Sequence, residues 1–557
     1  MKKILSLILA VAMIAGLCVG CAQSATNSTS SAGTKAAGTT GAATTAAAAA
    51  YPIVTSPLTL TWYKPLDSNQ AGAGIKDLNE TLYMQELEKK TGIHIQFQHP
   101  AIGQESTQFN LMISSGTLPD LISNGWTGYN GGPEKAISDG IIIDHEKLIE
   151  QYAVNFNKFV ATHPGAERFY KTDSGKAYCM PTFITLTADG KVHAAPDGRD
   201  FYYEAVVGLV LRQDWLTELG LTAPTTIDEW YTVLSAFKTK KQASAPFTCL
   251  LSNWKASAAF ITAYDIAYGF YEDGSKKAHF GPYEAAYKDF LTIFAKWYKE
   301  GLLDADFSTN DQKAVDAKVL DNKSGAWVGF SAGGIGSYIQ TAKKTNAAFD
   351  LVGVTVPTLQ KGATASMGNK SMPYNSTLPT ITTANKHQEE TIKYLDYTYS
   401  EEGDLLVNWG VKGTSYDVVN NQYQFTDKIA KDTAGLTPQQ AMQKYIWWGS
   451  GDFATRLALY KTYGADAEKR VVEGKALWGK TTRPAGLPPV TIASDKSSEY
   501  AKIMSDINTY VDEQFLKFVM GTQALDTFAN YQAQLKTMGI DKALQIQQEA
   551  LDRYYKR

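Results

Sequence analysis

The stretch Leu118-Pro119-Asp120-Leu121-Ile122-Ser123-Asn124-Gly125-Trp126 decides how the rest of the chain is interpreted. Its apolar centre predicts a short strand, and the polar, glycine-bearing residues after it predict a loop that carries an aromatic ring. In an open α/β sheet, ligands bind just beyond the carboxyl ends of the strands. This loop is therefore expected to contact a ligand, with Trp126 as the first candidate.

The segments around this stretch alternate between strand and helix patterns. Alternating apolar residues predict strands at 57–63 and 93–97, and amphipathic patterns predict helices at 79–90 and 104–115, before the strand at 120–123. Strand, helix, strand, helix, strand is the pattern of a parallel sheet covered by helices. The chain is therefore expected to contain an α/β sheet near its N-terminal end.

The later part of the chain is richer in helix. Strands are expected at 208–212, 324–330, 349–356 and 373–382, between helical segments that continue to the C-terminus. Arg212 is expected to tie its strand to the next helix, and Asp120 is expected to have a structural role within its own strand. Four tryptophans at helical spacing beside apolar residues are expected in the core: Trp215, Trp230, Trp297 and Trp409.

The N-terminus has the pattern of an export signal. Lys2 and Lys3 precede an apolar run over residues 4–17, which is too short for a mature membrane-spanning helix. The following Val19-Gly20-Cys21 resembles the lipobox of bacterial lipoproteins, although Cys18 stands where Leu is preferred. The resemblance implies that residues 1–20 are a signal peptide and that Cys21 is acylated, which anchors the protein at the extracellular face of the membrane. An ordinary secretory signal is the alternative.

Residues 21–56 are expected to form the acylated cysteine and a flexible tether. Positions 22–50 are almost entirely Ala, Ser, Thr and Gly, so no large apolar side chain is present to offset the entropy of ordering. The remaining chain is too long for one core, and at least two domains are expected.

Composition excludes some classes of function. Lys and Arg number 53 against 56 Asp and Glu, for a net charge of −3, so nucleic-acid binding is not expected. Beyond the signal, Cys179 and Cys249 either form one disulfide or remain as two buried thiols.

Catalytic and metal-binding motifs are absent from the sequence. The seven histidines form no His-x-x-x-His pair, and neither a Gly-x-Ser-x-Gly elbow nor a phosphate-binding glycine loop occurs. Residues 304–310 are spaced superficially like a calcium loop but lack its glycine and terminal acid, so a capped helix start is the preferred interpretation. No enzyme activity, cofactor or metal is predicted.

Several segments together resemble family 1 bacterial extracellular solute-binding proteins, the lipoprotein receptors of ABC importers of the carbohydrate type. The resemblance spreads over most of residues 57–557. It rests on Gly116-Thr117-Leu118-Pro119-Asp120-Leu121, on Leu211-Arg212-Gln213-Asp214-Trp215-Leu216, on Trp409-Gly410, and on Phe518-Val519-Met520-Gly521 with Asp552-Arg553-Tyr554.

This resemblance implies a two-lobed, periplasmic-binding-protein-like α/β fold of type II, with hinge-linked lobes and the ligand cleft between them. Lobe one is expected at 57–180 plus 371–435, and lobe two at 181–370 plus 436–557. The implied function is capture of a carbohydrate, most simply an oligosaccharide, by lobe closure and its delivery to the permease subunits of an ABC importer. The protein is expected to act as a monomer. An exported carbohydrate-active enzyme, a sugar-capture protein without a transporter, and a peptide receptor of the same fold are the alternatives.

A carbohydrate site needs aromatic rings to stack on apolar sugar faces and polar side chains to pair each buried hydroxyl. Most of the candidates end or follow apolar runs, whereas Trp327 lies within one, and for the aromatic residues core packing is the competing interpretation. Of Trp62 and Tyr63, one is expected to point into the core, and of the pair at 447 and 448 the second is the candidate. The expected ligand-binding residues are Trp62, Tyr63, Asn124, Trp126, Asn253, Trp254, Trp327, Tyr374 and Trp448.

Overall fold

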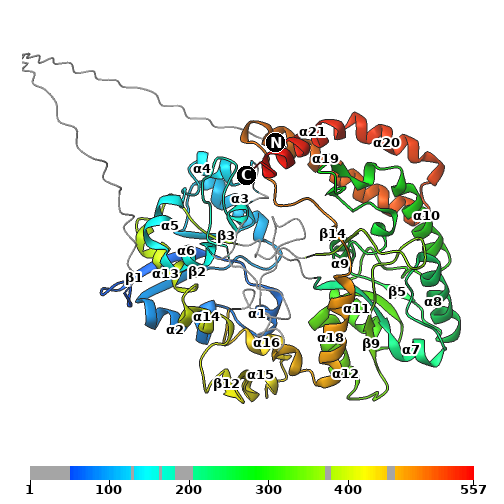
Figure 1. Ribbon diagram of the computed structural model, residues 1–557, viewed down its shortest axis with the longest axis horizontal. Helices are drawn as coiled ribbons and strands as arrows, with labels where there is room; N and C mark the ends of the chain where they lie inside the picture. Colours follow the sequence, from blue (N-terminus) through cyan, green and yellow to red (C-terminus); the bar gives the residue numbers. More distant parts are fainter. Residues whose placement is uncertain are drawn as a thin grey trace, which may run out of the picture. The chain divides into compact units, whose positions relative to one another are not determined.

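The computed structural model describes residues 50–126, 129, 131–161, 166–181, 205–370, 378–447 and 458–556 (Figure 1). The described residues belong to one compact unit that contains two separate four-stranded sheets. None of the helices in these ranges is long and apolar enough to cross a membrane. Cys21, Tyr374 and Trp448 lie outside the described residues, so their predicted roles stay predictions.

The first sheet has the strand order β11-β3-β1-β2. Strands β1 (Leu58–Tyr63), β2 (Ile93–Gln98) and β3 (Leu121–Asn124) are parallel, as the alternating sequence pattern predicted. Strand β11 (Leu378–Ile381) arrives from much later in the chain and pairs with β3 in the antiparallel direction. The parallel strands therefore direct their carboxyl ends to one edge of the sheet, where β11 begins.

Asp120 joins the first and third strands, which confirms its structural role. Its Oδ2 accepts hydrogen bonds from the Thr61 amide at 2.8 Å and from Thr61 Oγ1 at 2.7 Å, and its own amide donates to Thr61 Oγ1. The aspartate thus sets the register of β3 against β1 just before β3 starts. This register also sets which residue follows β3 at the sheet edge.

Helices from distant parts of the sequence cover the first sheet (Figure 1). Helix α2 (Leu82–Thr91) follows β1 and ends at Gly92, whose φ of 77° suits a residue without a side chain. Helix α13 (Gln388–Tyr397), drawn in yellow, packs against the early helices α5 (Glu146–Tyr152) and α6 (Val154–Ala161). The hydrophobic core beneath them combines side chains from 60–180 with side chains from 381–407.

The second sheet has the order β5-β8-β4-β9, and it is mixed. Strand β4 (Val207–Arg212) is completely buried and antiparallel to both β8 (Ala326–Phe330) and β9 (Leu351–Gly353), while β5 (Phe247–Thr248) is parallel to β8. Helix α18 (Ala465–Trp478) lies on β4 and β9, and Trp478 Nε1 donates to the Leu209 carbonyl. The central strand β4 is therefore antiparallel to its neighbours, whereas β1, β2 and β3 of the first sheet are parallel.

A helical layer surrounds the second sheet. Helices α7 (Gln213–Glu218) and α8 (Ile227–Lys240) follow β4, and the long α10 (Ala286–Lys299) packs against α19 (Ser494–Val519). The last helices of the chain, α20 (Phe528–Thr537) and α21 (Ile540–Tyr554), close this layer. Trp215, Trp230 and Trp297 are buried in this core, and Trp409 is buried in a smaller cluster, so the expectation of core packing is confirmed for all four.

Arg212 ties β4 to α7, as expected. Its Nε and Nη2 donate to the two Asp214 carboxylate oxygens at 2.8 and 2.6 Å, and its guanidinium lies 4.2 Å from the Phe349 ring centroid. Cys179 and Cys249 are free and buried, in separate cores. The disulfide alternative is therefore wrong, and the two-thiol alternative is correct. The proposed lobe boundaries stay a prediction.

His145 is a buried, neutral side chain that holds β11 in the first sheet. The Ile381 amide donates to His145 Nε2 at 3.0 Å, so Nδ1 carries the proton and donates to the Ile143 carbonyl at 2.9 Å. Burial lowers the pKa of His145 to about 4, although the carbonyls of Ala177 and Ile143 favour the charged form. A protonated His145 would lose its bond from Ile381.

We expect acid to destabilise the protein through His145. The unfolded chain binds a proton below about pH 6.5, whereas the folded chain binds it only near pH 4, so stability is lost as pH falls through this window. The contribution of His145 lowers the free energy of unfolding by about 2 kcal/mol between pH 7 and pH 5. Urea unfolding of residues 51–557 at both pH values measures it. His145→Gln should be less stable at pH 7 but should lose less between pH 7 and pH 5; equal losses in the two proteins would contradict the assignment.

Candidate functional site

The carboxyl ends of β1, β2 and β3 form the edge at which the sequence placed a ligand. Tyr63, Gln98 and Asn124 are the last residues of these strands, and Asn124 pairs with Leu378, the first residue of β11. Asn124 is half-buried, so part of its side chain is accessible at this edge. Its predicted hydrogen bond to a ligand hydroxyl stays a prediction.

Both aromatic residues at the end of β1 are buried, whereas one was expected to face the edge. Trp62 is 4% exposed and donates from Nε1 to Ser123 Oγ at 3.0 Å. The Tyr63 hydroxyl donates to the Glu105 carbonyl at 2.9 Å, and burial raises its pKa to about 12, so it stays protonated. In this structure the two side chains support the edge, and neither ring is free to stack on a sugar.

Trp126 also packs against its own sheet. It is 1% exposed, and its ring lies 5.9 Å from those of Phe109 and Tyr129. Its indole Nε1 is buried without a hydrogen-bond partner among the described residues. The packing interpretation describes this conformation, and the predicted ligand contact of Trp126 stays a prediction.

A cluster of rings and one lysine stands beside Trp62, and the sequence did not single it out as a cluster. Trp447 stacks on Trp62 with 5.8 Å between ring centroids, and Lys64 Nζ lies 4.8 Å from the Trp447 centroid. His99 stacks on Phe97 and holds the Lys64 carbonyl through Nδ1 at 2.6 Å. Of the adjacent Trp447 and Trp448, the second was predicted to face the ligand, and the inward packing of Trp447 is consistent with that prediction.

The carboxyl ends of β5, β8 and β9 form a second candidate edge, on the second sheet. Trp327 in β8 is fully buried against Tyr338, so the core interpretation describes it, whereas Phe330 at the end of the strand is 45% exposed. Phe330 begins a glycine-rich helical segment, residues 331–336, that leads into α12 (Ser337–Ala342). Among the described residues of this edge, Phe330 therefore offers an exposed ring, three residues beyond the predicted Trp327.

Asn253 and Trp254 lie on a helix rather than in a loop. Helix α9 (Leu251–Ser257) follows β5, and within it Asn253 is half-buried. Trp254 is fully buried, its ring lies 4.6 Å from that of Phe294, and its Nε1 donates to the Ala259 carbonyl at 3.2 Å. In this structure Trp254 therefore packs in the core with no exposed ring face, and its predicted ligand contact stays a prediction.

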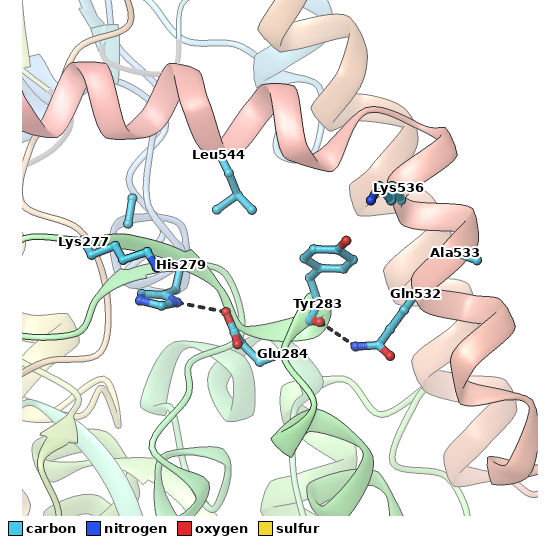
Figure 2. Close-up of a pocket in the computed structure, with 9 residues that line it drawn as sticks. Lys277, His279, Tyr283, Glu284, Gln532, Ala533, Lys536 and Leu544 are labelled. Carbon is cyan, nitrogen blue, oxygen red and sulfur yellow. Dashed lines mark hydrogen bonds and ion pairs between the residues drawn. The ribbon is translucent and has the colours of Figure 1, made fainter.

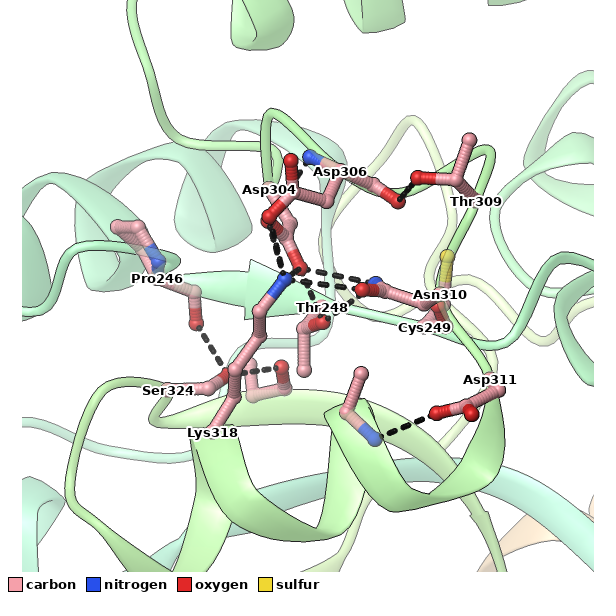
Figure 3. Close-up of polar contacts among 12 residues, drawn as sticks. Pro246, Thr248, Cys249, Asp304, Asp306, Thr309, Asn310, Asp311, Lys318 and Ser324 are labelled. Atoms are coloured by element: carbon pink, nitrogen blue, oxygen red, sulfur yellow. Dashed lines mark hydrogen bonds and ion pairs between the residues drawn. The ribbon is translucent and has the colours of Figure 1, made fainter.

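A charged cluster fixes the end of β5, from which α9 starts (Figure 3). Lys318 Nζ lies 2.7 Å from Asp304 Oδ2, 3.1 Å from Asp306 Oδ2 and 2.9 Å from Asn310 Oδ1. Asp304 in turn accepts from Thr248 Oγ1 at 2.6 Å. Burial alone would raise the pKa of Asp304, but the hydrogen bonds from Lys318, Thr248 and Asn310 bring it below its ordinary value.

This cluster explains the calcium-like spacing of residues 304–310. The ammonium of Lys318 occupies the centre of the oxygen atoms, and the following helix α11 (Gln312–Leu320) is capped by Asp311. The described residues contain no group of three His, Cys, Asp or Glu side chains that could hold a metal ion. A capped helix start was the preferred interpretation of residues 304–310; the cap of α11 lies one residue later, at Asp311, and Asp304 and Asp306 pair with Lys318 instead.

A separate polar pocket of about 470 Å³ lies between the hairpin β6 (Phe270–Glu272) and β7 (Ala278–Phe280) and the helices α20 and α21 (Figure 2). His279 bridges Glu284 at 2.9 Å and Asp273 at 3.1 Å, and Gln532 donates to the Tyr283 carbonyl. None of the predicted ligand residues lines it. The lining residues are Lys277, Ala278, His279, Tyr283, Glu284, Gln532, Ala533, Lys536 and Leu544.

Comparison with known proteins decides the family. A family model described as bacterial extracellular solute-binding protein matches residues 67–404. The chain belongs to this family. The resemblance seen in the sequence is therefore confirmed, and so is the two-lobed α/β fold that it implied.

Three relatives extend this finding to most of the chain. The fructooligosaccharide ABC transporter substrate-binding protein FusA of Streptococcus pneumoniae is 25% identical over 86% of this chain and 88% of its own length. Lipoprotein LipO of Bacillus subtilis is 26% identical over 62% of this chain and 66% of its own. The crystal structure of alginate-binding protein AlgQ2 without calcium ion has a TM-score of 0.71 and 26% identity, covering 90% of this chain and 99% of that one.

Proposed function

We propose that this protein is an extracellular receptor that captures an oligosaccharide and delivers it to an ABC importer. The observation that carries the proposal is the match to FusA, an ABC transporter substrate-binding protein named for fructooligosaccharides, over nearly the whole of both chains. The fold shared with AlgQ2, which is named for alginate binding, supports a carbohydrate as the solute. The solute itself is not implied by either name.

The receptor works by shifting a population of conformations. An oligosaccharide that contacts both lobes binds the closed form more tightly than the open one, and its binding free energy moves the population toward closure. The half-buried Asn124 and the exposed Phe330 stand at the edges of the two sheets, where such a ligand would be paired and stacked. No chemical step is required of the protein.

The anchor is part of the same proposal. Acylation of Cys21 would hold the protein at the membrane, and residues 22–56 would let the body rotate while it remains near the permease subunits. The relative named lipoprotein LipO supports this assignment. We propose that the receptor acts as a monomer and catalyses no reaction.

A thermal-shift screen of residues 51–557 tests the function. A ligand that binds only the folded state raises its stability by about 2.7 kcal/mol at a hundred times the dissociation constant. We expect a shift with one class of oligosaccharide, recovered chemically intact. Cleavage of that oligosaccharide would favour an exported carbohydrate-active enzyme, and a shift with peptides alone would overturn the choice of solute.

A further inference from the structure

Two partly buried lysines near the sheet edges lack a carboxylate partner among the described residues. Lys171, Lys241 and Lys318 have side chains that are 17–19% exposed, and each lies within 2.6–2.7 Å of a carboxylate oxygen. Lys64 and Lys370 are also half-buried, but neither forms an ion pair with any described residue. Both stand beside the sheet edges that the fold offers to a ligand.

Lys64 is the first residue after β1. Its amide still donates to the Gln98 carbonyl, so its position is fixed at the edge shared by β1 and β2. Its ammonium faces the ring of Trp447, which itself stacks on Trp62. Burial lowers the pKa of Lys64 to about 8, even though the nearby carboxylate of Asp67 favours the charged form.

Lys370 stands next to the second sheet. The preceding residue, Asn369, donates from Nδ2 to the carbonyl of Val207 at 3.0 Å, and Val207 pairs with Phe330 at the end of β8. This bond places the segment that carries Lys370 at the edge with the exposed Phe330 ring. Burial also lowers the pKa of Lys370.

A partly desolvated ammonium without an anion is unfavourable, and groups of this kind concentrate at functional sites. A ring face compensates only part of the lost hydration, because a cation over an aromatic ring gains about 0.5–2 kcal/mol. An anionic ligand group would restore a full charge partner to each lysine. A neutral sugar would leave both unpaired.

We propose that the oligosaccharide bound by this receptor is acidic, and that Lys64 binds its carboxylate or sulfate group, with Lys370 offering a second ammonium. The inference rests on the proposed function, because it names the class of solute for the same site. Lys64 reaches the acid from the first sheet, where the rings of Trp447 and Trp62 back it, and Lys370 reaches the ligand from the second. Neutral polar residues such as Asn124 would pair with the hydroxyls.

Matched acidic and neutral probes test the proposal by titration calorimetry. The probes are oligouronates with their carboxyl-reduced counterparts, and sulfated oligosaccharides with their desulfated counterparts. For residues 51–557 we expect one acidic probe to bind about tenfold or more tightly than its neutral counterpart, with affinity that falls as salt rises. The two probe pairs separate a carboxylate from a sulfate.

Variants then assign the charge. Lys64→Gln should weaken the acidic probe about tenfold, while Lys64→Arg should retain the preference for acid and Lys370→Gln should weaken it by a smaller factor. Lys89→Gln, at a surface lysine that is 70% exposed, is the matched control and should change nothing. Far-ultraviolet circular dichroism and the melting temperature confirm that each variant folds.

The outcomes distinguish a failure of the acidic-solute proposal from a failure of the proposed receptor function. Equal affinity for acidic and neutral counterparts, binding of neutral fructo-oligosaccharides alone, or unchanged acid binding by a folded Lys64→Gln would each overturn the acidic solute and leave the receptor in place. Failure of every saccharide to bind would overturn the proposed function as well.

Discussion

Replacing Lys318 by Met is expected to lower the free energy of unfolding by about 3 kcal/mol, the lower end of the cost of breaking a buried ion pair. The side chain of Asp304 is 4% exposed, so it cannot regain water when its cation is removed. Lys318 is 17% exposed, which lets some solvent reach the site and moves the expected value to the lower end. Thr248 and Asn310 would still donate to the carboxylate, but they carry no charge.

Urea unfolding of the wild-type protein and the variant measures this difference. Lys323→Met is the matched control: Lys323 is 57% exposed and 3.6 Å from Asp321, so its loss should cost no more than about 0.5 kcal/mol. Lys318→Met combined with Asp304→Asn should recover part of the loss, because the second change removes the unpaired charge. Equal stability of Lys318→Met and wild type would show that solvent compensates the carboxylate fully.

The Lys318→Met substitution should also affect the candidate ligand site, because the charged cluster positions helix α9. Asn310 Nδ2 donates to the Cys249 carbonyl at 3.1 Å, and Cys249 lies between the end of β5 and the start of α9, which carries Asn253. The charged cluster therefore positions a segment that the sequence placed at the ligand site. Its elements are distant in sequence, and only the fold shows that a lysine on α11 occupies the centre.

Local sequence patterns predicted the strands of the first sheet because apolar residues alternate with polar ones along each strand. The strand-helix alternation also predicted the parallel direction of β1, β2 and β3. The direction of strands that pair across distant parts of the chain was not predicted, because it depends on connections that no local pattern shows. Strand β11 joins β3 in the antiparallel direction and β4 lies antiparallel to both neighbours, although the local pattern of each strand is the same in a parallel sheet. The mixed second sheet could therefore not be predicted from its segments.

The candidate site was harder to predict because a tryptophan that packs in the core and one that stacks on a sugar have the same local signal. Trp126 was predicted from its position after a strand and Trp327 from its place within a short apolar run, and both are buried in this structure. Phe330 is exposed, but it ends the same apolar run that contains the buried Trp327. Lys64 follows β1 directly, and only the fold shows that it lies half-buried over the Trp447 ring without a carboxylate partner among the described residues.

Replacing Trp254 by Ala is expected to lower the free energy of unfolding by about 3–5 kcal/mol, the usual range for truncating a buried large aromatic residue. The Trp254 ring lies 4.6 Å from that of Phe294, 5.6 Å from that of Phe515 and 6.1 Å from that of Phe247. These neighbours come from α10, α19 and β5, so the cavity would open where three elements meet. The hydrogen bond from Nε1 to the Ala259 carbonyl would also be lost.

Asn253→Ala on the same helix separates the core role from a ligand role. Asn253 is half-buried, so its truncation should cost much less than that of Trp254, within about 0.5–1 kcal/mol. If Asn253 binds the solute, its variant should lose affinity for the oligosaccharide found in the screen while it melts nearly as wild type does. Trp254→Ala should show the reverse, with a large loss of stability and retained affinity at temperatures where the variant is folded. The milder Trp254→Phe keeps the test usable if the alanine variant fails to fold, and reduced affinity in that variant without reduced stability would return Trp254 to the ligand site.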